Sequence, residues 1–156
     1  MAGKPRRESM NSTHETFRRD IDYERYPGSH WWSTKKWITK RECRFKTKLR
    51  PPTAVGNKYV QLTPEGILTL REAYVFDGVT RGFDTVKSMR AAAKHDGGCQ
   101  LIEEGKLPWS FRLPVDDEFL STLIEDQFWK WWAKVRYKVV RCWSKLKEET
   151  TRRFSK

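Results

Sequence analysis

Acidic side chains and a histidine gather in one stretch of the chain, YVFDGVTRGFDTVKSMRAAAKHDGGCQLI, which runs from Tyr74 to Ile102. An aspartate and an imidazole can share a divalent metal ion, which activates water by lowering its pKa. A carboxylate can also orient a histidine that acts as a general base. The stretch is therefore a candidate metal or acid–base site. The side chains that could build it are Asp77, Thr80, Asp84, His95 and Asp96, with Arg90 and Asp117 in support.

The same residues could instead form a polar network that holds a strand against a helix. Asp77 follows an apolar run and precedes Gly78, whose backbone freedom allows a sharp turn. The helix expected after Asp84 carries both His95 and Asp96, but successive helical residues point about 100° apart. A single His-Asp pair also has low specificity as a metal signal. Spacing alone leaves the metal site, the acid–base site and the structural network open.

Nucleophilic chemistry has less support in the sequence. Cys99 and Ser88 lie close to His95 along the chain, but neither lies in a recognisable nucleophile elbow. The three cysteines, which include Cys43 and Cys142, are far apart and odd in number. This spacing argues against a disulfide framework and against a CxxC zinc site, so we expect reduced, partly buried thiols.

The net charge of +12 is unevenly distributed. Residues 1–58 carry 15 Lys and Arg against 6 Asp and Glu, and residues 127–156 carry 10 against 2. Residues 59–126, which include the candidate site, carry 7 against 12 and are acidic. Basic ends suit a polyanion such as nucleic acid, a membrane surface or an acidic protein face. Without a long apolar run, we expect no membrane span, no secretory signal and synthesis in a cytoplasm.

The length predicts one domain with tails. Residues 1–22 lack hydrophobic periodicity and are expected to form a flexible basic arm, residues 23–150 a single α+β domain, and residues 151–156 a basic tail. The domain opens on YERYPGSHWWSTKKW, whose tryptophans could anchor the arm or form a stacking platform for nucleic-acid bases.

Alternation predicts the strands. In WITKRECRFKTKLR, residues 37–50, the odd positions share one face of an extended strand and the even, mostly basic positions share the other. The basic face makes a candidate polyanion-binding surface of Lys40, Arg44, Lys46 and Lys48. The runs KYVQLT and GILTLR around a PEG turn predict a β-hairpin, and YVF predicts a further strand. We therefore expect an α+β fold, with a small, mostly antiparallel sheet over residues 37–77 followed by packed helices.

A first helix is expected after Asp84, which suits an N-cap, and it should end near Gly105. Its alanine-rich middle favours the helix, whereas Gly97 and Gly98 weaken the centre and could kink or split it. The run KLPWSFRLP that follows is typical of a connector.

A second helical segment opens at Pro114 with Asp116 or Asp117. Its apolar residues recur at three- and four-residue steps as far as Leu146, which is the pattern of an amphipathic helix. The spacing leaves open whether the segment is unbroken or bends near Ala133. Because a long helix in a small protein must cover the sheet, we interpret its tryptophans as core residues. Contact of its basic end with a membrane surface is the alternative.

The order FDG.T, then Asp-Thr, then an arginine and a His-Asp pair resembles the phage- and prophage-associated domain of unknown function 1353. The matching positions are Phe76, Asp77, Gly78, Thr80, Asp84, Thr85, Arg90, His95, Asp96, Gln100 and Leu101. The likeness continues through RLPVDDEFL, where Asp117 stands for the acidic residue of the family, and YKVVRCW, so that it covers roughly residues 65–143. Gly97, Gly98 and Cys99 replace the Ala, Leu and aromatic run usual in the family. The resemblance implies a phage origin and no settled activity.

Three functions fit these observations. The first is a bacteriophage virion-associated structural or accessory protein, in the tail or portal region, that docks onto other phage structural proteins through its basic, aromatic-rich ends without turnover. The second is a metal-dependent hydrolase of peptidoglycan or nucleic acid, with Asp77, His95 and Asp96 or Asp84 as ligands. The third is a nucleic-acid-binding module that uses the basic strand face and the ends. No cofactor is expected, and a divalent metal at the acidic stretch is the alternative.

Overall fold

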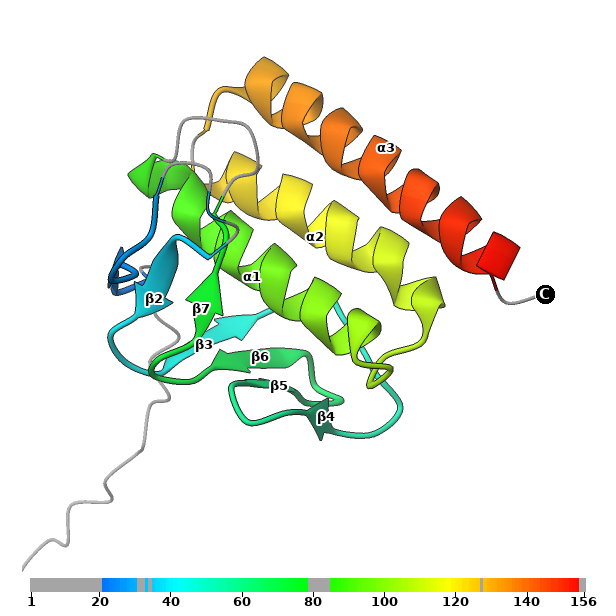
Figure 1. The fold of residues 1–156 in the computed structure, drawn as a ribbon, viewed down its shortest axis with the longest axis horizontal. Helices are drawn as coiled ribbons and strands as arrows, with labels where there is room; N and C mark the ends of the chain where they lie inside the picture. Colours follow the sequence, from blue (N-terminus) through cyan, green and yellow to red (C-terminus); the bar gives the residue numbers. More distant parts are fainter. Residues whose placement is uncertain (1–20, 31–32, 34, 79–84, 127, 155–156) are drawn as a thin grey trace, which may run out of the picture.

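In the computed structural model, which describes residues 21–30, 33, 35–78, 85–126 and 128–154, the strands precede the helices (Figure 1). Seven short strands form two antiparallel sheets. They are followed by α1 (Val86–Glu103), the short 3₁₀ helix η1 (Trp109–Phe111), α2 (Arg112–Glu125) and α3 (Lys130–Phe154). The expected α+β class is confirmed.

Each sheet is built from short antiparallel pairs. The three-stranded sheet has the order β1 (Tyr23–Arg25), β2 (Trp37–Thr39), β7 (Val75–Phe76). The four-stranded sheet has the order β3 (Cys43–Lys46), β6 (Ile67–Leu70), β5 (Val60–Leu62), β4 (Val55–Gly56). The predicted hairpin is confirmed as β5 and β6, with Leu62 opposite Leu68, and the predicted YVF strand is confirmed as β7.

The alternating run from Trp37 is divided between the two sheets, so the prediction of one continuous strand is wrong. At the end of β2, the Thr39 hydroxyl donates to the carbonyl of Arg71 at 2.7 Å and accepts the Tyr74 N–H at 2.9 Å. These bonds tie β2 to the loop before β7, and the chain bends before β3 begins. Arg41, expected on the same face as Thr39 and Cys43, is exposed at this bend and pairs with Asp22 at 3.0 Å.

Beyond the bend the predicted alternation holds. The odd positions Cys43, Phe45, Thr47 and Leu49 are buried, and the even basic positions Arg44, Lys46 and Lys48 are exposed. The buried side joins a core between the sheets and the helices that also contains Val60, Leu62, Leu68, Leu70, Met89, Leu101 and Val115.

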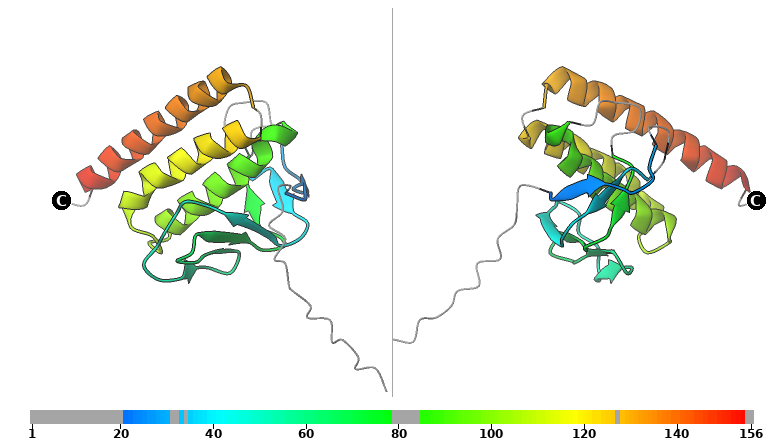
Figure 2. Two further views of the ribbon diagram at one scale, coloured as in Figure 1. Left: turned by 180° about the vertical axis from the view of Figure 1, so that it is seen from behind. Right: turned by 60° about the vertical axis from the view of Figure 1, so that its left-hand side comes forward.

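The helices are stacked outward from the sheets, with α1 nearest, α2 beside it and α3 outermost (Figures 1 and 2). A second, smaller core joins them and is made of Ala91, Phe119, Leu123 and Ala133. Helix α3 therefore packs on α2 and does not cover the sheets. The interpretation of its tryptophans as core residues is wrong, because Trp131, Trp132 and Trp143 are exposed. No helix among the described residues is long and apolar enough to cross a membrane.

The predicted helix boundaries shift for local reasons. Helix α1 has Thr85 as its N-cap, and the Thr85 N–H donates to Ser88 Oγ at 3.1 Å, whereas Asp84 lies outside the described residues. Helix α2 begins at Arg112, two residues before the predicted start at Pro114. This is possible because a proline is tolerated in the first turn of a helix. Helix α3 continues to Phe154, so the predicted tail begins inside a helix.

The long amphipathic pattern belongs to two helices, and the break comes before Ala133. The N–H of Asp126 donates to Thr122 and that of Phe128 to Leu123, both at 3.0 Å, which closes the end of α2. Arg90 of α1 holds this end through an ion pair with Asp126 at 2.7 Å. Here the turn between α2 and α3 is fixed by a residue far away in the sequence.

Gly97 and Gly98 do not split α1, which runs unbroken through them. A Cβ atom on Gly97 would lie 2.9 Å from Leu70 Cδ2 of β6, and one on Gly98 would lie 2.9 Å from both methyl carbons of Val115 in α2. The two glycines face different neighbours. Because neither glycine has a side chain, α1 can pack closely against the four-stranded sheet and against α2 at the same position along its length.

Replacing Gly98 by alanine is expected to lower the free energy of unfolding by about 1–3 kcal/mol, as overpacking does. The better helix propensity of alanine offsets only about 1 kcal/mol of that loss. Because both methyls of Val115 are in the way, rotation of its side chain gives no relief. Urea unfolding measures the effect, and Gly97→Ala should cost less, because its one contact shorter than 3.4 Å is with the end of the Leu70 side chain.

The double variant Gly98→Ala/Val115→Ala checks the cause. If the clash with Val115 is responsible, the double variant loses less stability than the two single variants together. Strict additivity, or a gain in stability from Gly98→Ala alone, would contradict the close approach of α1 to α2.

Candidate functional site

The imidazole of His95 binds Asp116, not Asp77. His95 Nε2 of α1 lies 2.9 Å from Asp116 Oδ1 of α2, and the Asp116 side chain is completely buried. The sequence suggested Asp116 only as one of two residues that open a helix. The available signal was the spacing of Arg112 and Asp116, four residues apart on one helical face, which form an ion pair at 3.4 Å.

Asp116 collects groups from all three helices. Its Oδ2 accepts hydrogen bonds from Arg141 Nη1 at 2.9 Å and Ser144 Oγ at 2.8 Å, both on α3. Arg112 Nε in turn donates to Ser144 Oγ at 2.8 Å. A buried carboxylate is stable only when it is paired and hydrogen-bonded. Both oxygens of the Asp116 carboxylate are therefore engaged in bonds that hold the helices together.

A second buried ion pair lies beside the first. Lys94 Nζ of α1 donates to Glu118 Oε1 at 2.6 Å and to Thr122 Oγ1 at 2.8 Å, both on α2. The other oxygen of Glu118 accepts the Lys48 N–H at 3.1 Å, just after β3. This pair joins α1, α2 and the four-stranded sheet. Sequence reasoning missed it, because neither Lys94 nor Glu118 belongs to a motif.

The other predicted site residues are dispersed. Asp96 accepts the backbone N–H of Asp77 at 2.9 Å, so strand end and helix are joined as the network hypothesis predicts. The Asp77 carboxylate itself lies 3.4 Å from Lys36 Nζ. Asp117 is exposed and accepts the Tyr137 hydroxyl at 2.5 Å. Arg90 holds the end of α2, as described above.

A metal site is not assembled by these contacts. Thr80 and Asp84 lie outside the described residues. Among the residues that are described, no three His, Cys, Asp or Glu side chains are placed to hold a metal ion. The metal-dependent hydrolase stays a prediction without support from the donor geometry.

The Cys99 thiol lies within hydrogen-bonding distance of the His95 ring and is buried. Cys99 Sγ lies 3.7 Å from His95 Nδ1 and 3.6 Å from Nε2. Nε2 is held by Asp116 at 2.9 Å, so Nδ1 is the ring nitrogen left for the thiol. The groups thus follow the order thiol, imidazole, carboxylate. Cys99 is, however, only 9% exposed, and it does not line the pocket at the sheet that is described below.

The surroundings of His95 favour its charged form. Burial lowers the pKa of the imidazole, but the electrostatic interaction with Cys99, the hydrogen bond to Asp116 and the Asp96 carboxylate 3.8 Å from Nδ1 outweigh it and raise the pKa well above the usual value. Burial likewise raises the pKa of Asp116, but its bonds to His95, Arg141 and Ser144 lower it overall. The pair is therefore an imidazolium and a carboxylate near neutral pH.

The candidate polyanion surface is exposed as predicted. Lys40, Arg44, Lys46 and Lys48 all face solvent, and Arg44 Nε pairs with Glu42 at 3.0 Å. A solvated charged face has the same appearance, so polyanion binding by these residues stays a prediction.

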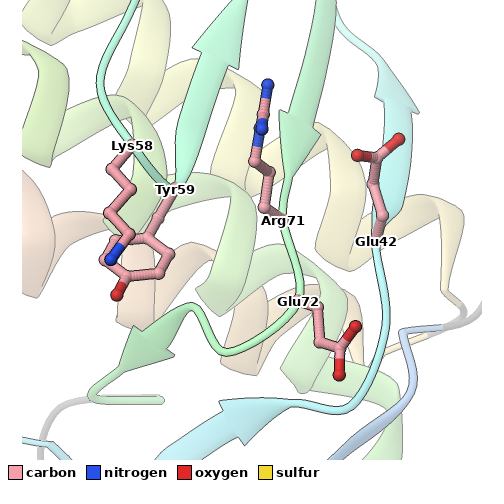
Figure 3. Close-up of a pocket in the computed structure, with 5 residues that line it drawn as sticks. All are labelled: Glu42, Lys58, Tyr59, Arg71 and Glu72. Carbon is pink, nitrogen blue, oxygen red and sulfur yellow. The ribbon is translucent and has the colours of Figure 1, made fainter.

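A pocket of about 340 Å³ lies at one end of the four-stranded sheet, where β3 and β5 begin and β6 ends. Figure 3 shows Lys58 and Tyr59 on one side of it and Glu42 on the other, with Arg71 and Glu72 between them. Lys58 Nζ lies 5.0 Å from the centre of the Tyr59 ring. Two acidic and two basic side chains line the pocket, so its charge favours neither an anionic nor a cationic ligand.

Comparisons of the chain with protein-family models, with curated proteins and with solved structures found no match. The resemblance to the phage-associated domain thus rests on the residues quoted for it and stays a prediction. Several of those residues contribute to the fold. Phe76 and Leu101 are in the core. Arg90, His95 and Asp96 make the contacts between elements that are described above.

Asp116→Asn is expected to lower the free energy of unfolding by about 3–5 kcal/mol, since it leaves buried cations without their counter-charge. The adjacent Asp117→Asn is a matched control, because Asp117 is exposed and its loss should cost under about 1 kcal/mol. Chemical denaturation measures both. Equal effects in the two variants would contradict a central role for Asp116.

Stability should fall across the pH window that begins near the ordinary pKa of histidine, about 6.5, and extends up to the raised pKa of folded His95. A folded-state pKa of His95 above its unfolded value means that the folded protein binds more protons in this window. The stabilisation is complete below the unfolded pKa and is lost as pH passes the folded pKa. Melting temperatures across the window should show a slope that His95→Gln reduces and His30→Gln, at an exposed site, preserves. The same slope in His95→Gln would overturn the assignment.

Proposed function

We propose that this protein is a docking component of a larger assembly, which it binds through the outer face of α3, and that the assembly is a bacteriophage particle. One observation carries the docking role. The apolar residues Trp132, Val135, Val139, Trp143 and Leu146, together the α3 stripe, are 39, 39, 42, 47 and 56% exposed. Their spacing puts them on one side of the helix, and exposed apolar residues gathered in this way mark interaction sites.

The residues on the inner face of α3 strengthen the argument that the α3 stripe binds a partner. The residues that α3 buries against α2 are small, since Ala133 is 0% and Ser144 is 2% exposed. The large apolar residues face outward. In a helix that only had to cover its own domain, the large residues would be on the buried side. The arrangement supports a partner that covers the outer face.

The pairing of the buried charged residues between the helices supports a binding role rather than catalysis. Among the described residues, both buried carboxylates between the helices are held by cations, Asp116 by Arg141 and Glu118 by Lys94, although Nη1 of the nearby Arg112 makes no hydrogen bond. A catalytic site needs a group that is left available to a substrate in a cleft. The phage setting is supported by the resemblance over residues 65–143 alone.

The proposal predicts that the protein occurs in purified particles at a fixed copy number. Val139→Glu is expected to fold normally, because the residue is exposed, yet to be lost from particles at least about tenfold, since a buried unpaired charge weakens an interface. Quantitative immunodetection in purified particles, with thermal unfolding of the free protein, measures both effects.

Ile124→Glu provides the matched control, because Ile124 on α2 is 41% exposed and lies outside the α3 stripe. It should remain in particles at the wild-type level. Absence of the wild-type protein from particles, or normal incorporation of Val139→Glu, would refute the docking role in a virion.

A further inference from the structure

We infer that the partner of the α3 stripe is an amphipathic helix with acidic residues along its edge, contributed by another protein. The inference rests on the proposed function and names the class of partner. Trp132, Val135, Val139, Cys142 and Leu146 follow one another at steps of three, four, three and four residues, and all are exposed. Apolar residues at this spacing form the contact line between paired helices.

The charge beside this line is of one sign. Two exposed lysines, Lys138 and Lys145, lie along one edge of the α3 stripe, and we call them the lysine row; Lys134 lies further round the helix. The chain has no acidic residue between positions 127 and 147. Arg141, which belongs to the same helical side, is turned inward to Asp116 at 2.9 Å. Residues that flank a helix pair select the partner by charge, so acidic side chains suit the lysine row.

A second copy of the chain does not meet this requirement. In an antiparallel pair, the lysine row of one helix would lie against that of the other. In a parallel pair, it would face the opposite edge, which carries Arg136 and Trp143. In neither orientation do residues 127–147 of the second helix offer a carboxylate to Lys138 or Lys145, and like charges across a helix pair are unfavourable. The charge pattern therefore favours a different chain.

A lipid surface fits less well than a helix. Amphipathic helices that lie on membranes insert bulky apolar residues, and their affinity grows with the apolar area buried. Along the line of three- and four-residue steps, the small side chains Val135, Val139 and Cys142 lie between Trp132 and Leu146, and Trp143 of the α3 stripe lies beside this line. Such an indented line can receive the side chains of a facing helix.

Two synthetic peptides of three heptads test the inference. Both carry leucine at positions a and d; one has glutamate and the other lysine at e and g. Calorimetry should show that the full-length protein binds the glutamate peptide at least about tenfold more tightly than the lysine peptide. Lys138→Glu/Lys145→Glu should reverse that preference. Lys46→Glu/Lys48→Glu, which alters exposed lysines of the sheet, should leave it unchanged.

Equal binding of the two peptides, or no reversal in the variant, would overturn the inference. So would binding of the protein to phosphatidylglycerol vesicles without binding to the glutamate peptide, because the partner would then be a membrane. The particle experiment separates this failure from that of the proposed function. If neither peptide binds but Val139→Glu is still lost from particles, the docking role stands and the partner class is wrong.

Discussion

The carboxylate of Asp116 is the group on which the arrangement of the three helices depends. It is buried completely and is held by His95 from α1, by Arg112 from its own helix, and by Arg141 and Ser144 from α3. An unpaired charge in this position would cost several kcal/mol. The helices can therefore pack well only in the arrangement that brings these partners to the one carboxylate. Contacts between small apolar residues alone would allow several relative positions of the helices.

Helix α1 transmits this constraint to the sheets. It is the middle element, with Gly97 against Leu70 of β6 and Gly98 against Val115 of α2. Lys94, on the same helix, reaches α2 through Glu118. Close apolar approach and directed ion pairs thus act on one short piece of helix, and each makes the other more effective because packing excludes water from the charges.

The parts of the structure that were predictable from the sequence are those set by neighbouring residues. Alternation and turn residues indicated the β5–β6 hairpin, and residue type drew attention to His95. The division of the long strand was not predictable, because the bonds of Thr39 go to a segment more than thirty residues away. The role of Asp116 was hidden for the same reason, since its local pattern is that of a helix start. Periodicity showed that the last helix is amphipathic, but packing decides which of its faces is covered.

The distribution of residue sizes on α3 has a consequence for how the protein can change over time. Folding depends on the inner positions, where Ala133, Ser144 and Arg141 leave little room for replacement. The outer positions contribute little to the stability of the isolated domain, because they are exposed in it. Substitutions there can alter recognition while the fold is kept. The same scaffold can therefore follow a partner that diverges, or acquire a new one, by changing one side of a single helix.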